Sequence, residues 1–352
     1  MDSTNFILNG KEIPFQPGQM ILEAARNGGV NIPTLCYLKD STPTGACRIC
    51  LVEVSGARSL VAACSTPVSP GMEVFTETQR VHGARKLNVE LLLAGGKHNC
   101  LVCEANGNCR LQDLAYFYKI TGLQFSQEEK QYPTEDENPF IVRDFSRCVL
   151  CGRCVQACNE VAVNRAISYG YRGKNSKIVT GGDRPYNDSE CVFCGQCVEV
   201  CPVGALTEKK AKGLGRPWET EKIRTTCPYC GVGCQQLLHV RDGRIVKVTA
   251  VEDAEPNRGR LCIKGRFGYD FIYSEDRLKR PLIRENGEFR EASWDEALDL
   301  VASKFKEIIH RDGPDAIAGV SSARSINEDS YQMQKLFRAA IGTNNIDHCA
   351  RT

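Results

Sequence analysis

Two identical cysteine runs constrain this chain more than any other feature. Cys148–Cys158 and Cys191–Cys201 both read C-x2-C-x2-C-x3-C, and the second run starts 43 residues after the first. Zinc sites pair two C-x2-C hooks around one tetrahedral ion. Three cysteines at x2 spacing instead wrap three corners of a cubane, and the fourth cysteine of such a run ligates the other cluster. The spacing therefore favours an internal duplication that binds two [4Fe-4S] clusters.

The remaining cysteines fall into three further groups and one single residue. The chain has 352 residues, 20 cysteines and a formal net charge of +2. The start of the chain lacks a basic segment followed by an apolar run, so no signal peptide is expected. No stretch of 18 or more apolar residues occurs, which excludes a membrane span, and the balanced charge gives no reason to expect nucleic acid. A cytoplasmic location and metal-bound thiolates, rather than disulfides, are expected.

The N-terminal group has the spacing C-x10-C-x2-C-x13-C. Asn5–Ile13 is apolar on both sides of an Asn-Gly pair, which predicts a β-hairpin, and Met20–Asn27 predicts a short helix that ends before two glycines. Hairpin, helix and cysteine loop resemble the ferredoxin-like β-grasp domain with a [2Fe-2S] cluster, in the variant of complex I and iron hydrogenases. The resemblance implies such a domain over residues 1–80, with four ligands: Cys36, Cys47, Cys50 and Cys64.

The second group has only three cysteines, but a histidine stands two residues before them. The order H-x1-C-x2-C-x5-C resembles the one-histidine, three-cysteine [4Fe-4S] domain of complex I and hydrogenase subunits, in which H-x3-C is the usual spacing. We expect this domain over residues 81–140, with short helices at Arg85–Ala94 and Leu111–Ile120 and a polar linker at Gln127–Pro139. The implied ligands are His98, Cys100, Cys103 and Cys109.

The duplicated runs resemble a two-cluster ferredoxin, expected over residues 141–212 with a Gly-rich excursion at Tyr169–Asp188 between its halves. A second linker is expected at Gly213–Glu221. The ligand sets expected from the spacing are Cys148, Cys151, Cys154 and Cys201 for one cluster, and Cys191, Cys194, Cys197 and Cys158 for the other.

The fifth group begins with the run Cys-Pro-Tyr-Cys-Gly-Val-Gly-Cys, and a hairpin is expected at His239–Val251 over Asp242-Gly243. With the closing Cys-Ile-Lys-Gly-Arg, this region, expected over 222–275, resembles the N-terminal [4Fe-4S] domain of molybdenum or tungsten bis-pterin oxidoreductases, formate dehydrogenases above all. The resemblance implies that Lys264 contacts the pterin and relays electrons between it and the cluster. The implied cluster ligands are Cys227, Cys230, Cys234 and Cys262.

Residues 276–352 have the pattern of an α/β domain. Ser293 to Glu296 form a capping-box pattern before a helix of 3.6-residue periodicity. A buried strand at Ala316–Val320 and a helix at Glu328–Ile341 follow. Strand and helix in alternation are typical of a parallel sheet. Only one such repeat is present, so we expect the truncated start of a molybdopterin-binding domain, and a multidomain α+β iron–sulfur protein as a whole.

The last residues resemble the stretch that leads into the metal-ligating cysteine or selenocysteine of formate dehydrogenases. The chain stops at Thr352, one position before that ligand, and selenocysteine is encoded by a stop codon. We therefore expect the N-terminal portion of a selenocysteine-containing formate dehydrogenase alpha subunit, with Cys349 as a flanking residue and not as a ligand.

The resemblance implies one [2Fe-2S] and four [4Fe-4S] clusters, and a molybdenum or tungsten bis-molybdopterin guanine dinucleotide in the full-length protein. Its partner would be an NAD-reducing flavoprotein with iron–sulfur subunits, or a hydrogenase or ferredoxin. The chain has neither G-x-G-x-x-G nor a P-loop, so nicotinamide chemistry is expected in a separate subunit. The alternative is a stand-alone electron-transfer subunit of a complex I-like or hydrogenase-like complex. This chain alone is expected to lack the catalytic metal ligand.

Overall fold

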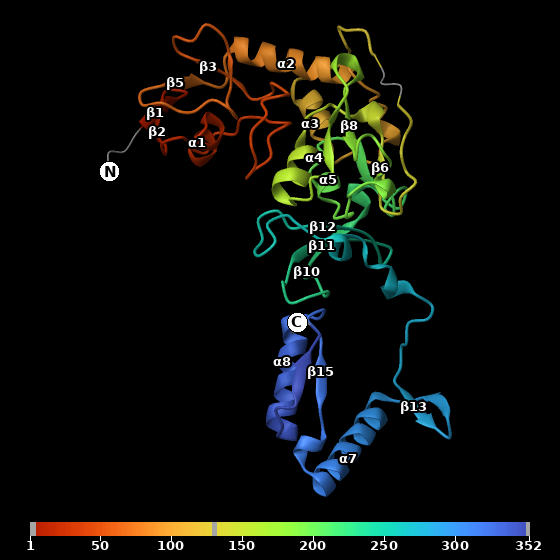
Figure 1. Cartoon of the computed structure of the whole chain (residues 1–352). Helices are drawn as coiled ribbons and strands as arrows, with labels where there is room; N and C mark the ends of the chain where they lie inside the picture. Colours follow the sequence, from red (N-terminus) through yellow and green to blue (C-terminus); the bar gives the residue numbers. More distant parts are fainter. Residues whose placement is uncertain (1–4, 129–131, 350–352) are drawn as a thin grey trace. The chain divides into compact units, whose positions relative to one another are not determined.

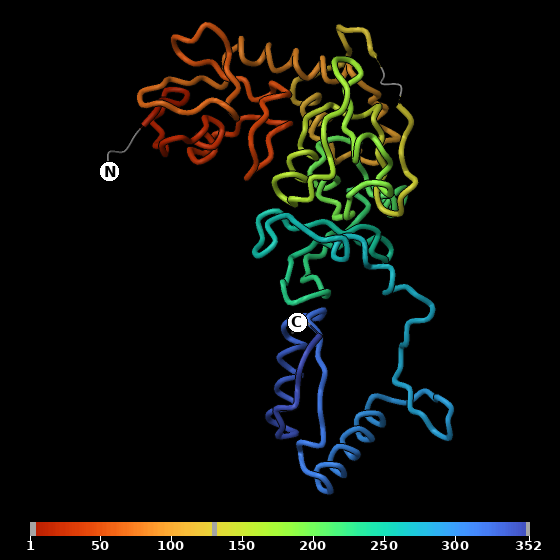
Figure 2. Tube along the Cα trace, in the orientation of Figure 1, coloured from red at the N-terminus to blue at the C-terminus, as the bar shows by residue number. Residues whose placement is uncertain are grey.

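The computed structural model describes residues 5–128 and 132–349 (Figures 1 and 2). The chain divides into two compact units, Met1–Glu221 with Val240–Lys247 and Lys222–His239 with Val248–Thr352. Within the described ranges, no helix combines the length and apolar character needed to cross a membrane.

The first unit begins with a five-stranded mixed sheet in the order β2-β1-β5-β3-β4, where β1 and β5 are parallel. The predicted hairpin is confirmed: β1 and β2 pair antiparallel across Asn9 and Gly10, whose φ angles are 50° and 81°. Asn and Gly tolerate these positive angles better than other residues. The elements are β1 Asn5–Leu8, β2 Lys11–Pro14, α1 Ile21–Asn27, β3 Leu51–Val54, β4 Val61–Ala62 and β5 Glu73–Phe75.

Helix α1 confirms the second N-terminal prediction and supplies much of the core. Ile21 and Leu22 are fully buried against Phe6, Val52 and Val74 of the sheet. Cys50 and Cys64 belong to the same buried cluster. The sheet therefore holds part of the first cysteine group inside its own apolar core.

The next segment is helical, with α2 Gln79–Ala94, the short turn η1 Cys100–Val102 and α3 Arg110–Phe117. Both helices were predicted, but α2 starts six residues earlier than expected. Its start is fixed by Thr78, whose side chain accepts a hydrogen bond from the backbone of Val81 at 3.2 Å. An N-cap of this kind satisfies a donor that the first turn leaves free.

The duplicated region repeats its backbone as well as its cysteines. Leu150 and Gly152 have positive φ angles of 53° and 77°, and Phe193 and Gly195, 43 residues later, have 51° and 74°. In each half this turn leads directly into a short helix. The elements are β6 Ile141–Arg143, η2 Phe145–Arg147, α4 Arg153–Gln156, η3 Ala157–Val161, β7 Ile167–Gly170, η4 Gly173–Asn175, β8 Lys177–Thr180, η5 Tyr186–Asp188, α5 Gln196–Glu199 and β9 Leu206–Glu208.

Two strand pairs organise this region. β6 pairs antiparallel with β9, which brings the two ends of the duplication together. The Gly-rich excursion is partly a β-hairpin, because β7 and β8 pair antiparallel from Ile167↔Thr180 to Gly170↔Lys177. The high glycine content of this segment hid the alternation of apolar and polar residues that is typical of a strand. Of the linker predicted at Gln127–Pro139, residues 129–131 lie outside the described residues, and Glu135 forms a bridge to Arg143.

Three strands, β10, β11 and β12, form a sheet next to the fifth cysteine group. The run Cys227–Cys234 lies between β10 and β11 in the sequence, and Cys262 follows β12. The turn predicted at Asp242-Gly243 is confirmed, with φ angles of 50° and 73°. The second predicted linker contains one turn of helix and the start of β10. The elements are η6 Pro217–Glu219, β10 Glu221–Thr226, β11 Gln235–Arg241, β12 Arg244–Ala250, α6 Ile263–Phe267 and η7 Asp270–Tyr273.

The C-terminal segment contains the predicted parallel strands, since β15 and β16 pair in parallel. The prediction of a buried strand at Ala316–Val320 was wrong in extent: β15 is Gly319–Ser321, and Val320 is 80% exposed. Its sheet has two strands in the described part of the chain, and a two-stranded sheet buries little surface. The elements are β13 Leu282–Glu285, β14 Glu288–Glu291, α7 Trp294–Asp312, η8 Pro314–Ala316, β15 Gly319–Ser321, α8 Asn327–Lys335, η9 Leu336–Ile341 and β16 Ile346–His348.

The predicted capping box at α7 is only half formed. Ser293 accepts a hydrogen bond from the backbone of Glu296 at 3.1 Å, as expected. The Glu296 carboxylate pairs instead with Arg290 at 2.5 Å. A guanidinium from the preceding strand competes with the backbone for this carboxylate. The spacing of the capping-box residues gives no information about that guanidinium.

Candidate metal centres

The four cysteines of the N-terminal group lie together, and all four are buried. The Cys36 backbone donates to Cys47 Sγ at 3.4 Å. Hydrogen bonds from the thiols of Cys47 and Cys64 lower the pKa of Cys36 to about 2. A hydrogen bond from Cys64 lowers the pKa of Cys50 to about 7. The same contacts raise the pKa values of Cys47 and Cys64.

In the second group, His98, Cys100, Cys103 and Cys109 line one cavity. Cys100 lies in η1 and Cys109 is the N-cap of α3. The backbone approaches closely at Gly204, where an added Cβ would meet Cys103 Sγ at 2.4 Å. The helices thus position the three cysteines, and a glycine leaves room for one of them.

His98 has the protonation state that a metal ligand needs. Burial lowers its pKa, which favours the neutral imidazole. Its Nε2 lies 3.2 Å from the carbonyl oxygen of Leu92. A carbonyl only accepts, so Nε2 carries the proton and Nδ1 keeps the lone pair. A hydrogen bond of this kind fixes tautomer and ring orientation in metal-binding histidines.

In the third group, Cys201 lies with the three cysteines of the first run. One cavity is lined by Cys148, Cys151, Cys154 and Cys201. Burial raises the pKa of Cys201 to about 11 and also raises those of Cys151 and Cys154. These thiols keep their protons without a metal, and metal binding must release them.

Cys158 lies with the second run rather than with the first. Burial raises the pKa of Cys197 to about 12, and the neighbouring charges of Cys194, Cys191 and Cys158 add to the effect. The Tyr186 hydroxyl lies 4.0 Å from Cys197 Sγ. Cys158 thus lies within electrostatic reach of the second run, and the exchange of fourth cysteines between the runs stays a prediction.

The fifth group is more open than the others. Cys227 is buried and Cys262 is exposed. Burial and then the charge of Cys234 raise the pKa of Cys227, and the Cys227 backbone donates to the carbonyl of Cys234 at 2.8 Å. Cys262 caps α6, and Lys264 lies exposed on that helix. Cys349 is outside all five groups, where its thiol lies 3.5 Å from the Ser322 hydroxyl.

The donor sets consist of thiols, with one imidazole in the second group, and they line shared cavities. Buried thiols around a shared cavity, with an imidazole in one set, match the ligands that iron–sulfur clusters use.

Sequence reasoning missed how the groups are joined. One buried apolar cluster contains Cys36 of the first group and Cys151 of the third, and the half-buried Cys109 of the second group packs against it. Arg153 Nη1 donates to the carbonyl of Tyr37 at 2.9 Å, next to two of these groups. No signal in the sequence links positions 116 residues apart.

Comparisons with known proteins match five stretches of the chain. Residues 2–79 match a 2Fe-2S iron–sulfur cluster binding domain, and 85–123 match the NADH-ubiquinone oxidoreductase-G iron–sulfur binding region. Residues 138–207 match the ferredoxin-like domain of NADH-quinone oxidoreductase subunit 3. Residues 220–274 match the molybdopterin oxidoreductase Fe4S4 domain, and 277–352 match molybdopterin oxidoreductase.

The matched regions are those of NADH-G-like molybdopterin oxidoreductases with iron–sulfur domains. Relatives include the NADPH-Fe(3+) oxidoreductase subunit alpha of Geobacter sulfurreducens, 40% identical over 98% of this chain and 40% of the relative. A putative formate dehydrogenase of Staphylococcus aureus is 35% identical over 98% of this chain and 39% of the relative. The chain therefore spans about two fifths of the length of these curated relatives.

A solved structure shows the same architecture over part of the chain. A chain in the crystal structure of an NAD+-reducing [NiFe]-hydrogenase has a TM-score of 0.53 and 34% identity, covering 60% of this chain and 90% of that chain. Together with the domain matches, this identifies the chain as the iron–sulfur electron-transfer part of a molybdopterin oxidoreductase.

Proposed function

We propose that the chain binds five iron–sulfur clusters and conducts electrons through them. The five groups of side chains assembled by the fold support this proposal, above all the shared cavity of Cys148, Cys151, Cys154 and Cys201. In this assignment the N-terminal cysteines hold [2Fe-2S], and the other four groups hold [4Fe-4S], with His98 as the single nitrogen ligand. Thiolates delocalise charge into such clusters, so an electron is accepted with little rearrangement of the protein.

We further propose that the full-length protein is a formate dehydrogenase. A bis-pterin site with molybdenum or tungsten would supply the chemistry that oxidises formate to carbon dioxide, a proton and two electrons. Support comes from the Cys227–Cys234 run and from the relatives named putative formate dehydrogenase. Lys264 follows Cys262 by two residues, so its ammonium group is proposed to assist electron passage between cluster and pterin. A selenocysteine ligand after Thr352 stays a prediction, and Thr352 lies outside the described residues.

A second function has specific support. The Geobacter relative is named NADPH-Fe(3+) oxidoreductase, and the structural neighbour is an NAD+-reducing hydrogenase. In this alternative the chain carries electrons between a nicotinamide-oxidising or nicotinamide-reducing partner subunit and another acceptor, in a complex I-like or hydrogenase-like assembly without formate chemistry.

The test uses the product of the complete gene, with the nucleotide sequence after the Thr352 codon read first. We expect formate-dependent reduction of a viologen dye by the purified protein, lost when Lys264→Ala breaks the relay while the iron content stays unchanged. Lys247→Ala, which removes a lysine from strand β12, serves as the matched control. Reduction by NADPH but not by formate, from protein with full iron and metal content, would assign the second function.

A further inference from the structure

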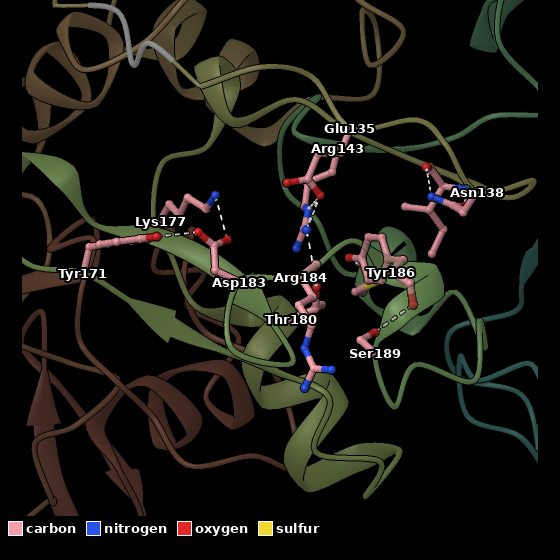
Figure 3. Close-up of polar contacts among 12 residues, drawn as sticks. Glu135, Asn138, Arg143, Tyr171, Lys177, Thr180, Asp183, Arg184, Tyr186 and Ser189 are labelled. Carbon is pink, nitrogen blue, oxygen red and sulfur yellow. Dashed lines mark hydrogen bonds and ion pairs between the residues drawn. The ribbon is translucent and has the colours of Figure 1, made fainter.

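A buried arginine, Arg143, lies at the end of β6, and Figure 3 shows it beside Glu135. Arg143 is 2% exposed, and its guanidinium carbon lies 4.5 Å from the centre of the Tyr186 ring and 4.9 Å from that of Phe145. Its Nε donates to Glu135 Oε2 at 2.9 Å. Backbone hydrogen bonds in both directions hold Glu135 opposite Arg143.

Arg143 is close to both groups. It belongs to the wall of the cavity lined by Cys148, Cys151, Cys154 and Cys201. Tyr186, on which the guanidinium lies, has its hydroxyl 4.0 Å from Cys197 Sγ of the other group. One cation therefore acts electrostatically on both sets of thiols.

The charge of Arg143 is only partly compensated. Its Nη1 has no hydrogen-bond partner among the residues that the structure describes. Glu135, the ion-pair partner, is 20% exposed on its side chain, so water screens it more than it screens the arginine. Burying a charge is costly, and a buried ion pair is weak evidence of a stabilising role. A different role explains the position better.

We propose that Arg143 raises the reduction potentials of the two clusters in the duplicated region, and that Glu135 limits this effect. The proposal rests on the proposed function, since it requires clusters in both groups. Reduction adds one electron to a cluster, and a nearby cation in a weakly screened site stabilises the reduced form. Glu135 acts with the opposite sign. Arg143 acts on the clusters through its charge and is not itself a metal ligand.

The experiment is a redox titration of the iron-loaded chain, followed by electron paramagnetic resonance. Arg143→Met is expected to lower the potentials of the clusters in the duplicated region, and Arg143→Lys to leave them nearer those of the unmodified protein. Glu135→Gln is expected to raise them. Arg58→Gln, which removes the same charge from an exposed position of the first unit, is the matched control and should shift nothing.

Opposite shifts for Arg143→Met and Glu135→Gln support the proposal, because a general loosening of the fold would not change sign with charge. Unchanged potentials in both variants, or shifts of the same sign, overturn it. If Arg143→Met does not take up iron, the Glu135→Gln titration decides: raised potentials support the proposal, and unchanged or lowered potentials overturn it. Missing clusters in the unmodified protein would instead contradict the proposed function, as shown by iron content before any titration.

Discussion

At the scale of single residues, His98 decides whether the second group has a full set of ligands. Three cysteines leave one corner of a cubane without a protein ligand. His98 lines the same cavity as those cysteines, is neutral because it is buried, and donates from Nε2 to Leu92. A neutral imidazole in place of a thiolate makes a cluster less negative and raises its potential. The residue therefore affects the direction of electron flow as well as cluster binding.

We expect His98→Ala to lose the second cluster, lowering iron content by about four atoms per chain while the other clusters remain. His98→Cys should keep the cluster but lower its potential, because a thiolate adds negative charge. His82→Ala is the control, since His82 is a half-exposed histidine paired with Glu77. Iron analysis and electron paramagnetic resonance measure both effects. Full iron content in His98→Ala would show that His98 is not a cluster ligand and that its role is the hydrogen bond to Leu92.

At the scale of elements, polar contacts at its N-terminal end determine where helix α2 begins and how it is attached to the sheet. Helix α2 spans 16 residues and joins the N-terminal sheet to the second cysteine group. Its N-cap Thr78 also donates to Glu53 Oε2 at 2.8 Å, on strand β3 of the sheet. Further along the helix, the buried Arg85 donates from Nε to the carbonyl of Leu51 at 2.9 Å. The first turns of α2 are thus attached to the sheet by polar contacts.

Thr78→Ala removes both contacts of the hydroxyl, and we expect it to lower the free energy of unfolding by about 1 kcal/mol, the usual value of an N-cap. Thr78→Ser keeps the oxygen and should be close to the unmodified protein. Urea unfolding of the iron-loaded protein, followed by circular dichroism, measures the difference. A midpoint for Thr78→Ala equal to that of the unmodified protein would show that the cap contributes nothing to stability.

At the scale of the whole molecule, the chain is a series of small regions that bury little apolar surface each. The N-terminal sheet has a continuous core, whereas the buried cluster of the C-terminal segment consists of Ile317, Phe337 and Ile341. Domains of this size are marginal by themselves, and bound metal supplies folding free energy. In the cysteine-rich regions, the clusters are expected to replace the missing core.

Removal of iron by a chelator is therefore expected to unfold most of the chain. The clusters hold segments far apart in the sequence, such as Cys148 and Cys201, and nothing else of comparable strength replaces them. Far-UV circular dichroism and iron content, followed together during chelation, should fall in parallel. A spectrum that stays native after the iron is lost would show that the apolar cores are sufficient.

Much of this organisation was predictable from short-range patterns. The Asn9-Gly10 and Asp242-Gly243 turns were predicted, because their residue types determine backbone angles within a few positions. The cysteine spacing within residues 148–201 also predicts two ligand sets, and four of these cysteines, Cys148, Cys151, Cys154 and Cys201, line one cavity. The start of α2 was missed, because the helix reaches back to its cap at Thr78. The extent of strand β15 was missed as well, because burial depends on neighbouring strands.

The sequence by itself determined the five groups of candidate ligands, since a metal-binding motif is a local spacing of donors on a chain. Only the tertiary structure decided what surrounds them. It placed Tyr37 against Arg153, brought cysteines of three groups into or against one apolar cluster, and set Arg143 on the ring of Tyr186. These contacts join positions far apart in sequence. They exist only because the β6–β9 pair and the helices bring distant segments together. No local pattern in the sequence predicts these long-range contacts.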